Sequence, residues 1–288
     1  MTLSGKAKLA GIIGWPVAHS LSPRLHGYWL SEYGIDGAYV PLPVAPENIG
    51  EALKSLPKLG FAGVNVTVPH KEAAMRAIDE LDDNAMRLGA VNTIEINEGG
   101  GLVGRNTDGF GFIENLRAGA PLWQPGDGPA VVLGAGGASR AVVAALLDAG
   151  VPEIRLINRT LARAEVLAAD IGGPIHVIPW SQASDAFDGA GLLTNTTTLG
   201  MTGHAPLDVE LARLPGTAVV NDIVYNPLRT PLLEQADVLG LKTVDGLGML
   251  LHQARPGFAA WFGHQPEVNE GLRAHVLAGL HGREDKSS

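Results

Sequence analysis

A glycine-rich turn in the second half of the chain has the residue types that bind phosphate. The run Gly134-Ala135-Gly136-Gly137-Ala138-Ser139 follows the apolar stretch Ala130–Leu133 and opens a helical pattern. Gly134 permits a tight turn, Gly136 allows the backbone to approach a pyrophosphate, and the first N–H groups of the helix face that anion. The third fingerprint position holds Ser139, a departure from glycine or alanine, and a ligand-free strand–helix turn is the alternative. We predict that this turn binds the pyrophosphate of a dinucleotide.

The tip of the next strand indicates which dinucleotide binds. An NAD site usually ends this strand with a carboxylate that holds the ribose 2′-hydroxyl. Here the strand ends at Asn158-Arg159-Thr160, and Arg163 follows one helical turn later. A guanidinium suits a 2′-phosphate, and the Thr160 hydroxyl can bind the same group or cap the next helix. Basic residues are disfavoured at a helix N-terminus without an anion, so we predict that these four residues bind NADP rather than lining a solvated helix start.

Polar side chains in the first half follow strand-like runs. Ser20 and Ser22 precede a helix that begins with Pro23, so Ser22 is the expected N-cap, and two hydroxyls at a helix N-terminus also suit a carboxylate. Lys71 lies in the first turn of a helix, where a cation is locally unfavourable. Because α/β ligand sites gather at the carboxyl ends of strands, we favour a functional lysine over a surface charge. For Asp108 the ordinary alternative is a helix N-cap.

Strand-like runs alternate with helical patterns, which predicts an α/β fold with a mainly parallel sheet in each of two domains. The strands expected are Leu9–Ile13, Ala38–Leu42, Gly63–Val68, Ala130–Leu133, Glu153–Asn158, Gly191–Thr194 and Ala218–Ile223. The helices expected are Pro23–Tyr33, Lys71–Leu88 and Ser139–Ala149, the first two ended by Gly34 and Gly89. From Gly246 onward the pattern is helical.

The Gly- and Pro-rich loop Trp123–Pro129 marks the expected domain boundary. We therefore predict a substrate-binding catalytic domain at 1–122 and a Rossmann-type NADP-binding domain at 123–245. C-terminal helices at 246–288 are expected to pack back on the first domain. The tail Glu284–Ser288 is expected to be disordered.

Composition narrows the function classes. The 288 residues are 45% hydrophobic and 18% charged, which is typical of globular proteins, and the net charge of -9 disfavours nucleic acid as a partner. The chain has no cysteine, which excludes thiolate zinc sites and fits a reducing compartment, and its histidines have no metal-binding spacing. No apolar stretch approaches the ~20 residues that span a bilayer. We expect a cytoplasmic protein without a metal site or membrane partner; its oligomeric state, a homodimer included, is left open.

Further motifs occur along the chain in one order. They are His19-Ser-Leu-Ser-Pro23, Asn65-Val-Thr-Val-Pro-His-Lys71, Gly89-Ala-Val-Asn-Thr93, Asn106-Thr-Asp-Gly109, Asn195-Thr-Thr-Thr-Leu-Gly-Met201, Asp222-Ile-Val-Tyr-Asn-Pro-Leu228 and Gly246-Leu-Gly-Met-Leu-Leu-His-Gln-Ala254. With the glycine-rich turn and the Asn-Arg-Thr tip, they make the chain resemble the shikimate dehydrogenase family nearly end to end. Two places vary: Gly27 follows His26 where the family more often has asparagine, and Trp15 leaves the preference for ring substituents open.

The resemblance implies reversible, NADPH-linked reduction of 3-dehydroshikimate to shikimate, an oxidoreduction at a CH–OH group in the chorismate pathway of aromatic amino acid biosynthesis. It implies that Lys71 is the catalytic group and that Asp108 orients it. The substrate carboxylate would be held by Ser20, Ser22 and Tyr225, and the ring hydroxyls by Thr67, Asn92, Asp108 and Gln253. On the cofactor side the resemblance adds Ile223, Gly246, Met249 and, less directly, Asp83.

Ordinary alternatives exist for several of these residues. Ile223 and Met249 would be core residues in most proteins, and Asp83 a solvated helix charge. Gln253 differs, because a polar residue within the apolar stretch Met249–Ala254 requires a partner.

Two other functions remain open. One is a dehydrogenase of the same fold that acts on quinate or another cyclitol acid, although the Asn-Arg-Thr tip disfavours NAD-using quinate relatives. The other is a non-catalytic NADP-binding sensor, which could retain the glycine-rich turn and Arg159 without an acid–base pair. The presence of both Lys71 and Asp108 favours an enzyme.

Overall fold

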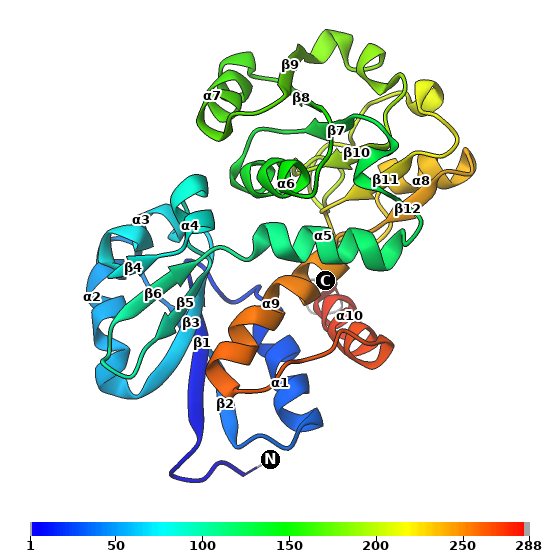
Figure 1. Cartoon of the computed structure of the whole chain (residues 1–288). Coiled ribbons are helices and arrows are strands. Elements are labelled where there is room, and N and C mark those ends of the chain that lie inside the picture. The colour runs from blue at the N-terminus through cyan, green and yellow to red at the C-terminus, as the bar shows by residue number, and fades with distance from the viewer. Residues whose placement is uncertain (1, 285–288) are drawn as a thin grey trace. The chain divides into compact units, whose positions relative to one another are not determined.

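A computed structural model describes residues 2–284, with side-chain burial through residue 280. Apart from Glu284, the tail that was expected to be disordered lies outside the described residues. The chain forms two compact units (Figure 1). The first contains the chain up to Thr107 together with the segment from Gln253 onward, and the second is Asp108–His252.

The first unit is built on a six-stranded mixed sheet. Its strands lie in the order β2-β1-β3-β5-β6-β4, and β5 is antiparallel to both of its neighbours. The strands are β1 (Lys8–Gly14), β2 (Gly37–Pro43), β3 (Phe61–Val66), β4 (Glu80–Leu81), β5 (Thr93–Ile96) and β6 (Leu102–Arg105). Burial is continuous along β1 from Ala10 to Gly14, whereas β2 alternates and is more exposed toward its carboxyl end. Side chains of β1 and β3 such as Ile13, Val64 and Val66 form the core.

The helices of this unit are short at the start of the chain and long at its end. They are α1 (Ser22–Glu32), α2 (Ile49–Ser55), α3 (Lys71–Ala74), α4 (Asp83–Leu88), α9 (Leu247–Phe262), which begins in the second unit, and α10 (Glu270–Glu284). Trp261 of α9 donates from Nε1 to the carbonyl oxygen of Ile94 at 3.0 Å. A Cβ at Gly63 would lie 2.1 Å from the Trp261 ring nitrogen, so only glycine permits this contact between helix and sheet. The C-terminal helices therefore contribute to the core of the first unit.

The helix predicted over Lys71–Leu88 is wrong in its middle. The structure has α3, a 3-10 turn at Met75–Ala77, the short strand β4 and then α4. Asp79 exchanges two hydrogen bonds with Leu102, through its backbone N–H and its carboxylate, and β4 pairs with β6. Asp82 caps α4 by accepting from the N–H of Ala85 at 2.7 Å. Pairing with β6 and a local cap thus override the helical preference of this stretch.

The second unit has a fully parallel six-stranded sheet. Its order, β12-β11-β10-β7-β8-β9, is the doubly wound order 3-2-1-4-5-6 of a Rossmann fold read from the other edge. The strands are β7 (Ala130–Leu133), β8 (Ile154–Asn158), β9 (Ile175–Pro179), β10 (Leu192–Asn195), β11 (Val219–Asp222) and β12 (Lys242–Val244). The helices are α5 (Asp108–Gly119), α6 (Gly137–Asp148), α7 (Leu161–Ile171), α8 (Pro231–Val238) and the start of α9. This topology confirms the predicted α/β class.

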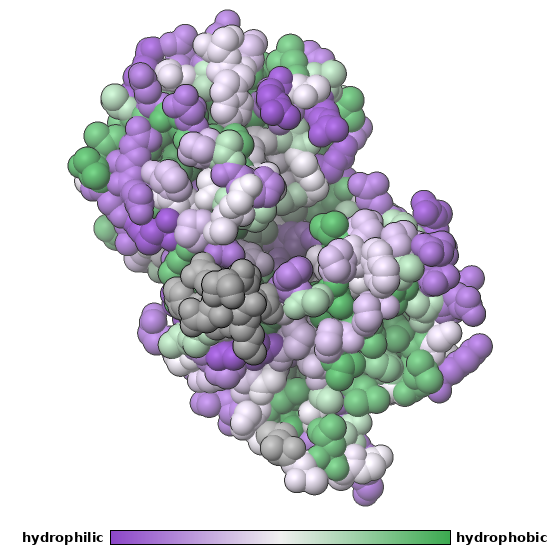
Figure 2. All heavy atoms as spheres, turned by 180° about the vertical axis from the view of Figure 1, so that it is seen from behind, coloured by the Kyte–Doolittle hydropathy of each residue, from purple (hydrophilic) through white to green (hydrophobic). Residues whose placement is uncertain are grey.

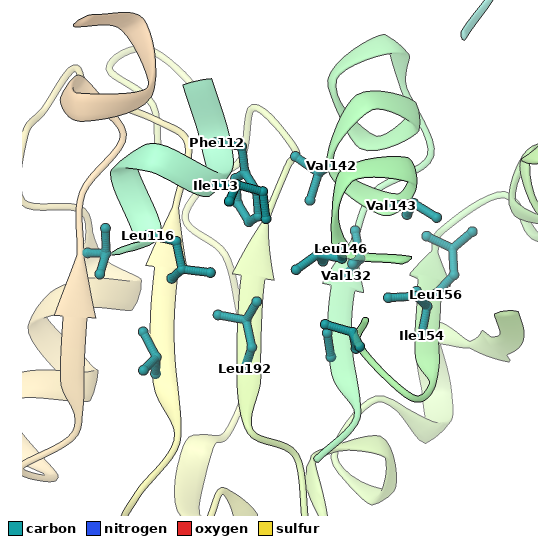
Figure 3. Packing of buried hydrophobic residues seen from close by; sticks show 14 of the residues in the cluster. Phe112, Ile113, Leu116, Val132, Val142, Val143, Leu146, Ile154, Leu156 and Leu192 are labelled. Atoms are coloured by element: carbon teal, nitrogen blue, oxygen red, sulfur yellow. The ribbon is translucent and has the colours of Figure 1, made fainter. Parts of the chain in front are cut away.

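Helices α5 and α6 cover one face of the second sheet. Figure 3 shows Phe112 and Leu116 of α5 and Val142 and Leu146 of α6 pointing toward the strand residue Val132 and its neighbours. The two helices are close, because a Cβ at Gly109 would lie 3.0 Å from both the Ala141 oxygen and the Ala145 side chain. The division between the units accordingly lies at Thr107/Asp108, ahead of the loop Trp123–Pro129 where the sequence placed it.

The surface of the second unit, at the top of Figure 2, carries many hydrophilic residues with small hydrophobic areas between them. Within residues 2–284, no helix has the length and apolar character needed to span a bilayer.

Candidate active site

The topology of the first sheet brings the polar loops of the first unit to one edge. Strands β1 and β3 are parallel neighbours with Ile13 opposite Val66, so the loops that follow them leave the sheet together. The N–H of Trp15 donates to the carbonyl oxygen of Val68 at 3.1 Å, and the N–H of Thr67 donates to Ile13 at 2.9 Å. The loop that carries Ser20 and Ser22 is thereby joined to the loop that carries Thr67 and Lys71.

The antiparallel strand β5 adds two more segments at the same edge. Thr93 pairs with both Asn65 of β3 and Arg105 of β6, so the start of β5 lies at the carboxyl ends of β3 and β6. The backbone of Asn92 accepts from the N–H of Val66 at 2.9 Å and donates to Arg105 at 3.0 Å. Asn92 and the residues that follow β6 are therefore placed beside the Thr67–Lys71 loop.

The amide of Asn92 has a fixed orientation. Its Oδ1 accepts from the hydroxyl of Thr93 at 3.0 Å, from the N–H of Thr107 at 2.9 Å and from the hydroxyl of Thr107 at 3.2 Å. Since donors surround the oxygen, the amide nitrogen supplies the donors for the other contacts of this side chain. That orientation suits a residue that donates to a ligand hydroxyl.

Two buried or half-buried residues that the sequence did not single out support this arrangement. Asn65 donates from Nδ2 to the Asn92 carbonyl and to the Thr93 hydroxyl, each at 3.1 Å. Tyr39 donates from its hydroxyl to Asn65 Oδ1 at 2.7 Å. Burial raises the pKa of Tyr39 well above its usual value, and the nearby Ser22 hydroxyl opposes part of that shift. Tyr39 therefore lies between the serine loop and the Asn92 network.

The predicted N-cap role of Ser22 is wrong. The N-cap of α1 is Leu21, which itself forms no side-chain cap bond, and Ser22 is already helical. The Ser20 hydroxyl accepts from the N–H of Ser22 at 3.2 Å. Since Ser22 follows Leu21 in the first turn, its hydroxyl is not committed to capping.

Lys71 is the first residue of α3, as the sequence predicted for its position in the first turn. Its carbonyl oxygen accepts from the N–H of Val91 at 2.9 Å, and the preceding residue, His70, is buried with Nε2 2.8 Å from the Val44 oxygen. The backbone that presents Lys71 is therefore fixed on both sides.

Asp108 opens α5, directly after Thr107, and is 6% exposed. Lys71 belongs to the first unit and Asp108 to the second. Their action as a pair stays a prediction.

The remaining predicted residues fall in different places. Gln253 of α9 belongs to the first unit and is partly exposed, so it is not the buried polar group that the apolar stretch suggested. Asp83 is an exposed residue at the start of α4 in the first unit, in keeping with the ordinary reading of a helix charge in contact with solvent. Tyr225 lies in the second unit, in the loop after β11, and is partly buried.

The glycine-rich turn has the geometry that a pyrophosphate needs. Gly134 has φ +111°, and a Cβ there would lie 2.7 Å from the Thr196 hydroxyl, so this position requires glycine. Cβ atoms at Gly136 and Gly137 would meet no heavy atom within 4 Å, which leaves open space at the N-terminus of α6. The residues present therefore fit a dinucleotide phosphate at this helix end.

Ser139, the departure from the usual fingerprint, has a structural reason. It is fully buried, and its hydroxyl accepts from the N–H of Gly136 at 3.2 Å. The same hydroxyl lies 2.5 Å from that of Thr196, which also donates to the Leu133 carbonyl at 2.7 Å. Ser139 thus ties the turn to the end of β7, a role the motif alone could not reveal.

The tip of β8 is arranged around Asn158. Its amide donates to the Thr160 carbonyl at 2.7 Å, which bends the chain into α7. Arg159 and Arg163 are exposed, and neither forms an ion pair with any residue in the described part of the chain. By contrast, Arg140, Arg155 and Arg213 of the same unit pair with carboxylates. Two uncompensated arginines at a helix N-terminus suit an anionic ligand such as a 2′-phosphate.

Ile223, Gly246 and Met249 lie together in the second unit. A Cβ at Gly246 would come within 2.2 Å of the Ile223 oxygen, so the two backbones are in close contact. Met249 is buried in the core cluster, and Ile223 packs against the same cluster. Met249 is thus a core residue, whereas Ile223 is partly exposed at the margin of the same core. Across residues 2–284 there is no cluster of three metal-binding side chains.

Comparisons with known proteins give one family match in each half of the chain. A family model described as shikimate dehydrogenase substrate binding domain matches residues 12–94. A second, described as shikimate / quinate 5-dehydrogenase, matches residues 126–198. The first match covers the loops of the first sheet, and the second covers the glycine-rich turn and the tip of β8.

Similar proteins are found both by sequence and by structure. Shikimate dehydrogenase (NADP(+)) from Paramagnetospirillum magneticum is 63% identical over 96% of this chain and 100% of its own length. The crystal structure of shikimate 5-dehydrogenase from Thermus thermophilus in complex with NADP(H) and shikimate is 40% identical, with a TM-score of 0.83 and coverage of 94% and 99%. Quinate dehydrogenase from Corynebacterium glutamicum in complex with NAD is 30% identical, with a TM-score of 0.87 and coverage of 94% and 99%.

Proposed function

The chain belongs to the shikimate dehydrogenase family, and from that premise we infer that it catalyses the reversible NADPH-dependent reduction of 3-dehydroshikimate to shikimate. It is thus an NADP-dependent oxidoreductase that acts on a CH–OH group in the chorismate pathway. The observation that supports the substrate half best is the convergence of hydroxyl, amide and ammonium groups at one edge of the first sheet.

For the substrate we propose the following contacts. Ser20 and Ser22 hold the carboxylate, because two hydroxyls at the start of α1 provide neutral donors beside a helix N-terminus. Thr67 and Asn92 hold ring hydroxyls, and the fixed orientation of the Asn92 amide supports this role. Tyr225 joins the two serines in holding the carboxylate, and Asp108 and Gln253 hold ring hydroxyls together with Thr67 and Asn92.

The proposed chemistry assigns one proton to Lys71. NADPH, when bound, supplies the hydride that converts the ketone to an alcohol. As the ketone becomes an alkoxide, the ammonium of Lys71 stabilises the negative charge on its oxygen and donates a proton to it. Asp108 orients the ammonium and the hydroxyl that forms. In the reverse direction the same lysine accepts the proton from the substrate hydroxyl.

For the cofactor we propose that Gly134–Ala138 hold the pyrophosphate and that Asn158, Arg159, Thr160 and Arg163 hold the 2′-phosphate. The two exposed arginines, which have no carboxylate partner among the described residues, support NADP over NAD. Ile223, Gly246 and Met249 would contact the nicotinamide end. Asp83 remains the weakest member of the set, since it is an exposed residue of the first unit.

A spectrophotometric assay tests substrate, cofactor and catalysis together. Shikimate and quinate are each offered with NADP and with NAD, and we expect the highest kcat/KM for shikimate with NADP. Faster oxidation of quinate would support the paralogue with another cyclitol acid. Tight binding of NADP without turnover of either acid would support the sensor instead.

Domain roles and setting are also proposals. In place of the expected bounds 1–122, 123–245 and 246–288, we assign the substrate half to the unit formed by the chain up to Thr107 and the segment from Gln253 onward, and the NADP half to Asp108–His252. The cytoplasmic location and the homodimer stay predictions, which cell fractionation and sedimentation velocity check.

A further inference from the structure

The carboxylate of Asp222 lies at the end of β11 and is fully buried. It accepts three hydrogen bonds from three different segments. Oδ1 accepts from Nδ2 of Asn195 and from the N–H of Val224, each at 3.0 Å, and Oδ2 accepts from the Thr230 hydroxyl at 2.7 Å. Asp222 therefore joins the end of β10, the loop after β11 and the N-cap of α8.

Asn195 extends this connection into a second loop. Its Oδ1 accepts from the N–H of Thr197 at 3.0 Å and from the Thr197 hydroxyl at 2.7 Å. The Thr197 hydroxyl in turn accepts from the N–H of Leu199 at 3.0 Å. One buried carboxylate and one amide thus order both loops at the carboxyl ends of β10 and β11. In a doubly wound sheet this is the edge where ligands bind.

Asp222 acts directly on the residues assigned to the nicotinamide end. Val224, whose N–H donates to Asp222 Oδ1, separates Ile223 from Tyr225 in the chain. Ile223 is held on its other side by Asn195, whose carbonyl oxygen accepts the Ile223 N–H at 3.1 Å, and by the backbone contact with Gly246. The direction in which Ile223 and Tyr225 point thus depends on the bond between Asp222 and Val224.

We propose that Asp222 is a positioning residue of the dehydrogenase: it fixes the Ile223–Tyr225 backbone so that these two side chains meet the nicotinamide and the substrate carboxylate. This inference rests on the proposed function and on the roles assigned there to Ile223 and Tyr225.

The charge of Asp222 gives the proposal a second readout. Burial raises the pKa of Asp222 to about 6, and the bonds from Thr230, Val224 and Asn195 oppose that rise. The groups that face the carboxylate from α8, the loop and β10 are thus a hydroxyl, an N–H and an amide, all uncharged. Below pH 6 the carboxylate gains a proton, which occupies one acceptor position and makes the residue resemble asparagine.

Asp222→Asn is the test, because it keeps the shape and replaces one acceptor oxygen by a donor. We expect kcat/KM for shikimate to fall about 10- to 100-fold at pH 8, in the range that misplacement of a positioned group produces. We expect the dissociation constant of adenosine 2′,5′-bisphosphate to stay within about twofold, since this probe reaches only the β7–β8 side. The ratio of wild-type to variant kcat/KM should narrow as the pH falls through 6.

Asp237→Asn is the matched control. Asp237 is an exposed carboxylate of α8 that pairs with Arg229. Replacing it with asparagine should leave kcat/KM for shikimate unchanged. Unchanged kcat/KM in Asp222→Asn, or loss of bisphosphate binding in parallel with activity, overturns the positioning role. If the wild type itself oxidises no shikimate, the proposed function fails instead, so the two failures are distinct.

A second pair of variants decides the matter if Asp222→Asn does not fold. Thr230→Val removes the donor to Oδ2, whereas Thr230→Ser keeps it. We expect the valine variant to lose several-fold in kcat/KM and the serine variant to retain wild-type activity. Equal activity of the two variants would contradict the proposal.

Discussion

Lys71 combines an unfavourable local position with a firmly held backbone. It begins α3, where a cation faces the positive end of the helix dipole, so its charge is locally unfavourable for stability. A role in catalysis would explain why a lysine stands there. We expect Lys71→Ala to lower kcat by about 10²- to 10⁴-fold, the usual contribution of a general acid, while KM for shikimate changes only a few-fold. Steady-state kinetics measure this, with the exposed Lys54→Ala of α2 as control. An unchanged kcat in the Lys71 variant would remove the lysine from the mechanism.

Arg159 provides the residue-scale prediction for the cofactor. The other arginines of its unit that were compared above bind carboxylates, whereas Arg159 is exposed at the tip of β8 without such a partner in the described chain. A charge-assisted bond to a 2′-phosphate is worth about 1.5–3 kcal/mol. Arg159→Ala should therefore raise KM for NADP by about 10- to 100-fold and leave KM for NAD unchanged.

The control for Arg159 is Arg117→Ala, which removes an exposed arginine of α5 in the same unit. It should leave both cofactor constants unchanged. An equal loss for NADP and NAD in the Arg159 variant would mean that the residue supports the turn rather than recognising the phosphate.

At the residue scale, local chemistry made part of the site predictable. The need for glycine at 134 and the absence of a carboxylate at 159 can both be read from a few adjacent residues, and the structure gives the first a physical reason in the positive φ of Gly134. Tyr39 and Asn65 could not be found in this way. Their hydrogen bond connects residues 26 positions apart, and its value depends on the pairing of β3 with β5.

At the scale of elements, His26 shows how α1 is fixed in the first unit. The ring is fully buried, stacks on Tyr39 of β2 with centroids 3.9 Å apart, and lies 5.8 Å from the ring of Phe258 in α9. Within the described part of the chain, neither ring nitrogen has a hydrogen-bond partner. An aromatic packing role therefore explains this histidine better than a ligand role.

The buried ring predicts a dependence of stability on pH. Burial lowers the pKa of His26 to about 3, against a smaller opposing effect of Asn65, from 6.5 in an exposed histidine. The unfolded chain therefore gains a proton below pH 6.5 that the folded chain binds only near pH 3. The free energy of unfolding falls across this window, by up to about 5 kcal/mol at 1.36 kcal/mol per pKa unit.

His26→Phe keeps the stack and removes the titration. We expect its free energy of unfolding, from urea titrations followed by circular dichroism, to fall less between pH 6.5 and 4 than that of the wild type. His176→Gln, at an exposed position on β9, is the control and should keep the wild-type dependence. Parallel pH curves for wild type and His26→Phe would show that His26 is not the group responsible.

Strands that are continuous runs of apolar residues could be predicted from the sequence, whereas an element that forms only by pairing with a distant strand could not. The runs that became β7 and β8 are apolar because both faces of a parallel sheet are covered. The stretch 71–88 reads as a helix, yet β4 interrupts it because Asp79 and Asp82 bond to β6 and to the start of α4. No local pattern contains that information.

At the scale of the whole molecule, the first unit is discontinuous in sequence. Composition and turn residues predicted two α/β parts, but contacts of α5 with α6 move the division to Thr107/Asp108. The segment from Gln253 onward belongs to the first unit, where Trp261 and Gly257 of α9 pack against the sheet.

The end of the chain is bound mainly to α1. Leu272 and Val276 of α10 are fully buried, the Trp29 indole donates to the Glu267 carbonyl at 2.9 Å, and the Tyr33 hydroxyl accepts from the Glu267 N–H at 3.0 Å. Each buried aliphatic side chain contributes about 1.5–3 kcal/mol. Their sum is a large share of the roughly 5–15 kcal/mol by which a typical domain is stable.

A chain that ends at Gly263 should therefore lose the first unit's function while keeping that of the second. We expect no turnover of shikimate and fast amide exchange in α1, because α1 loses the buried side chains of α10 and the acceptor of Trp29. Adenosine 2′,5′-bisphosphate should bind as tightly as to the full chain, since residues 134–163 belong to the other unit. Removal of residues 285–288 alone is the control and should change neither readout. Retained activity in the shorter chain would show that α10 is dispensable, and parallel loss of bisphosphate binding would show that the two units do not fold independently.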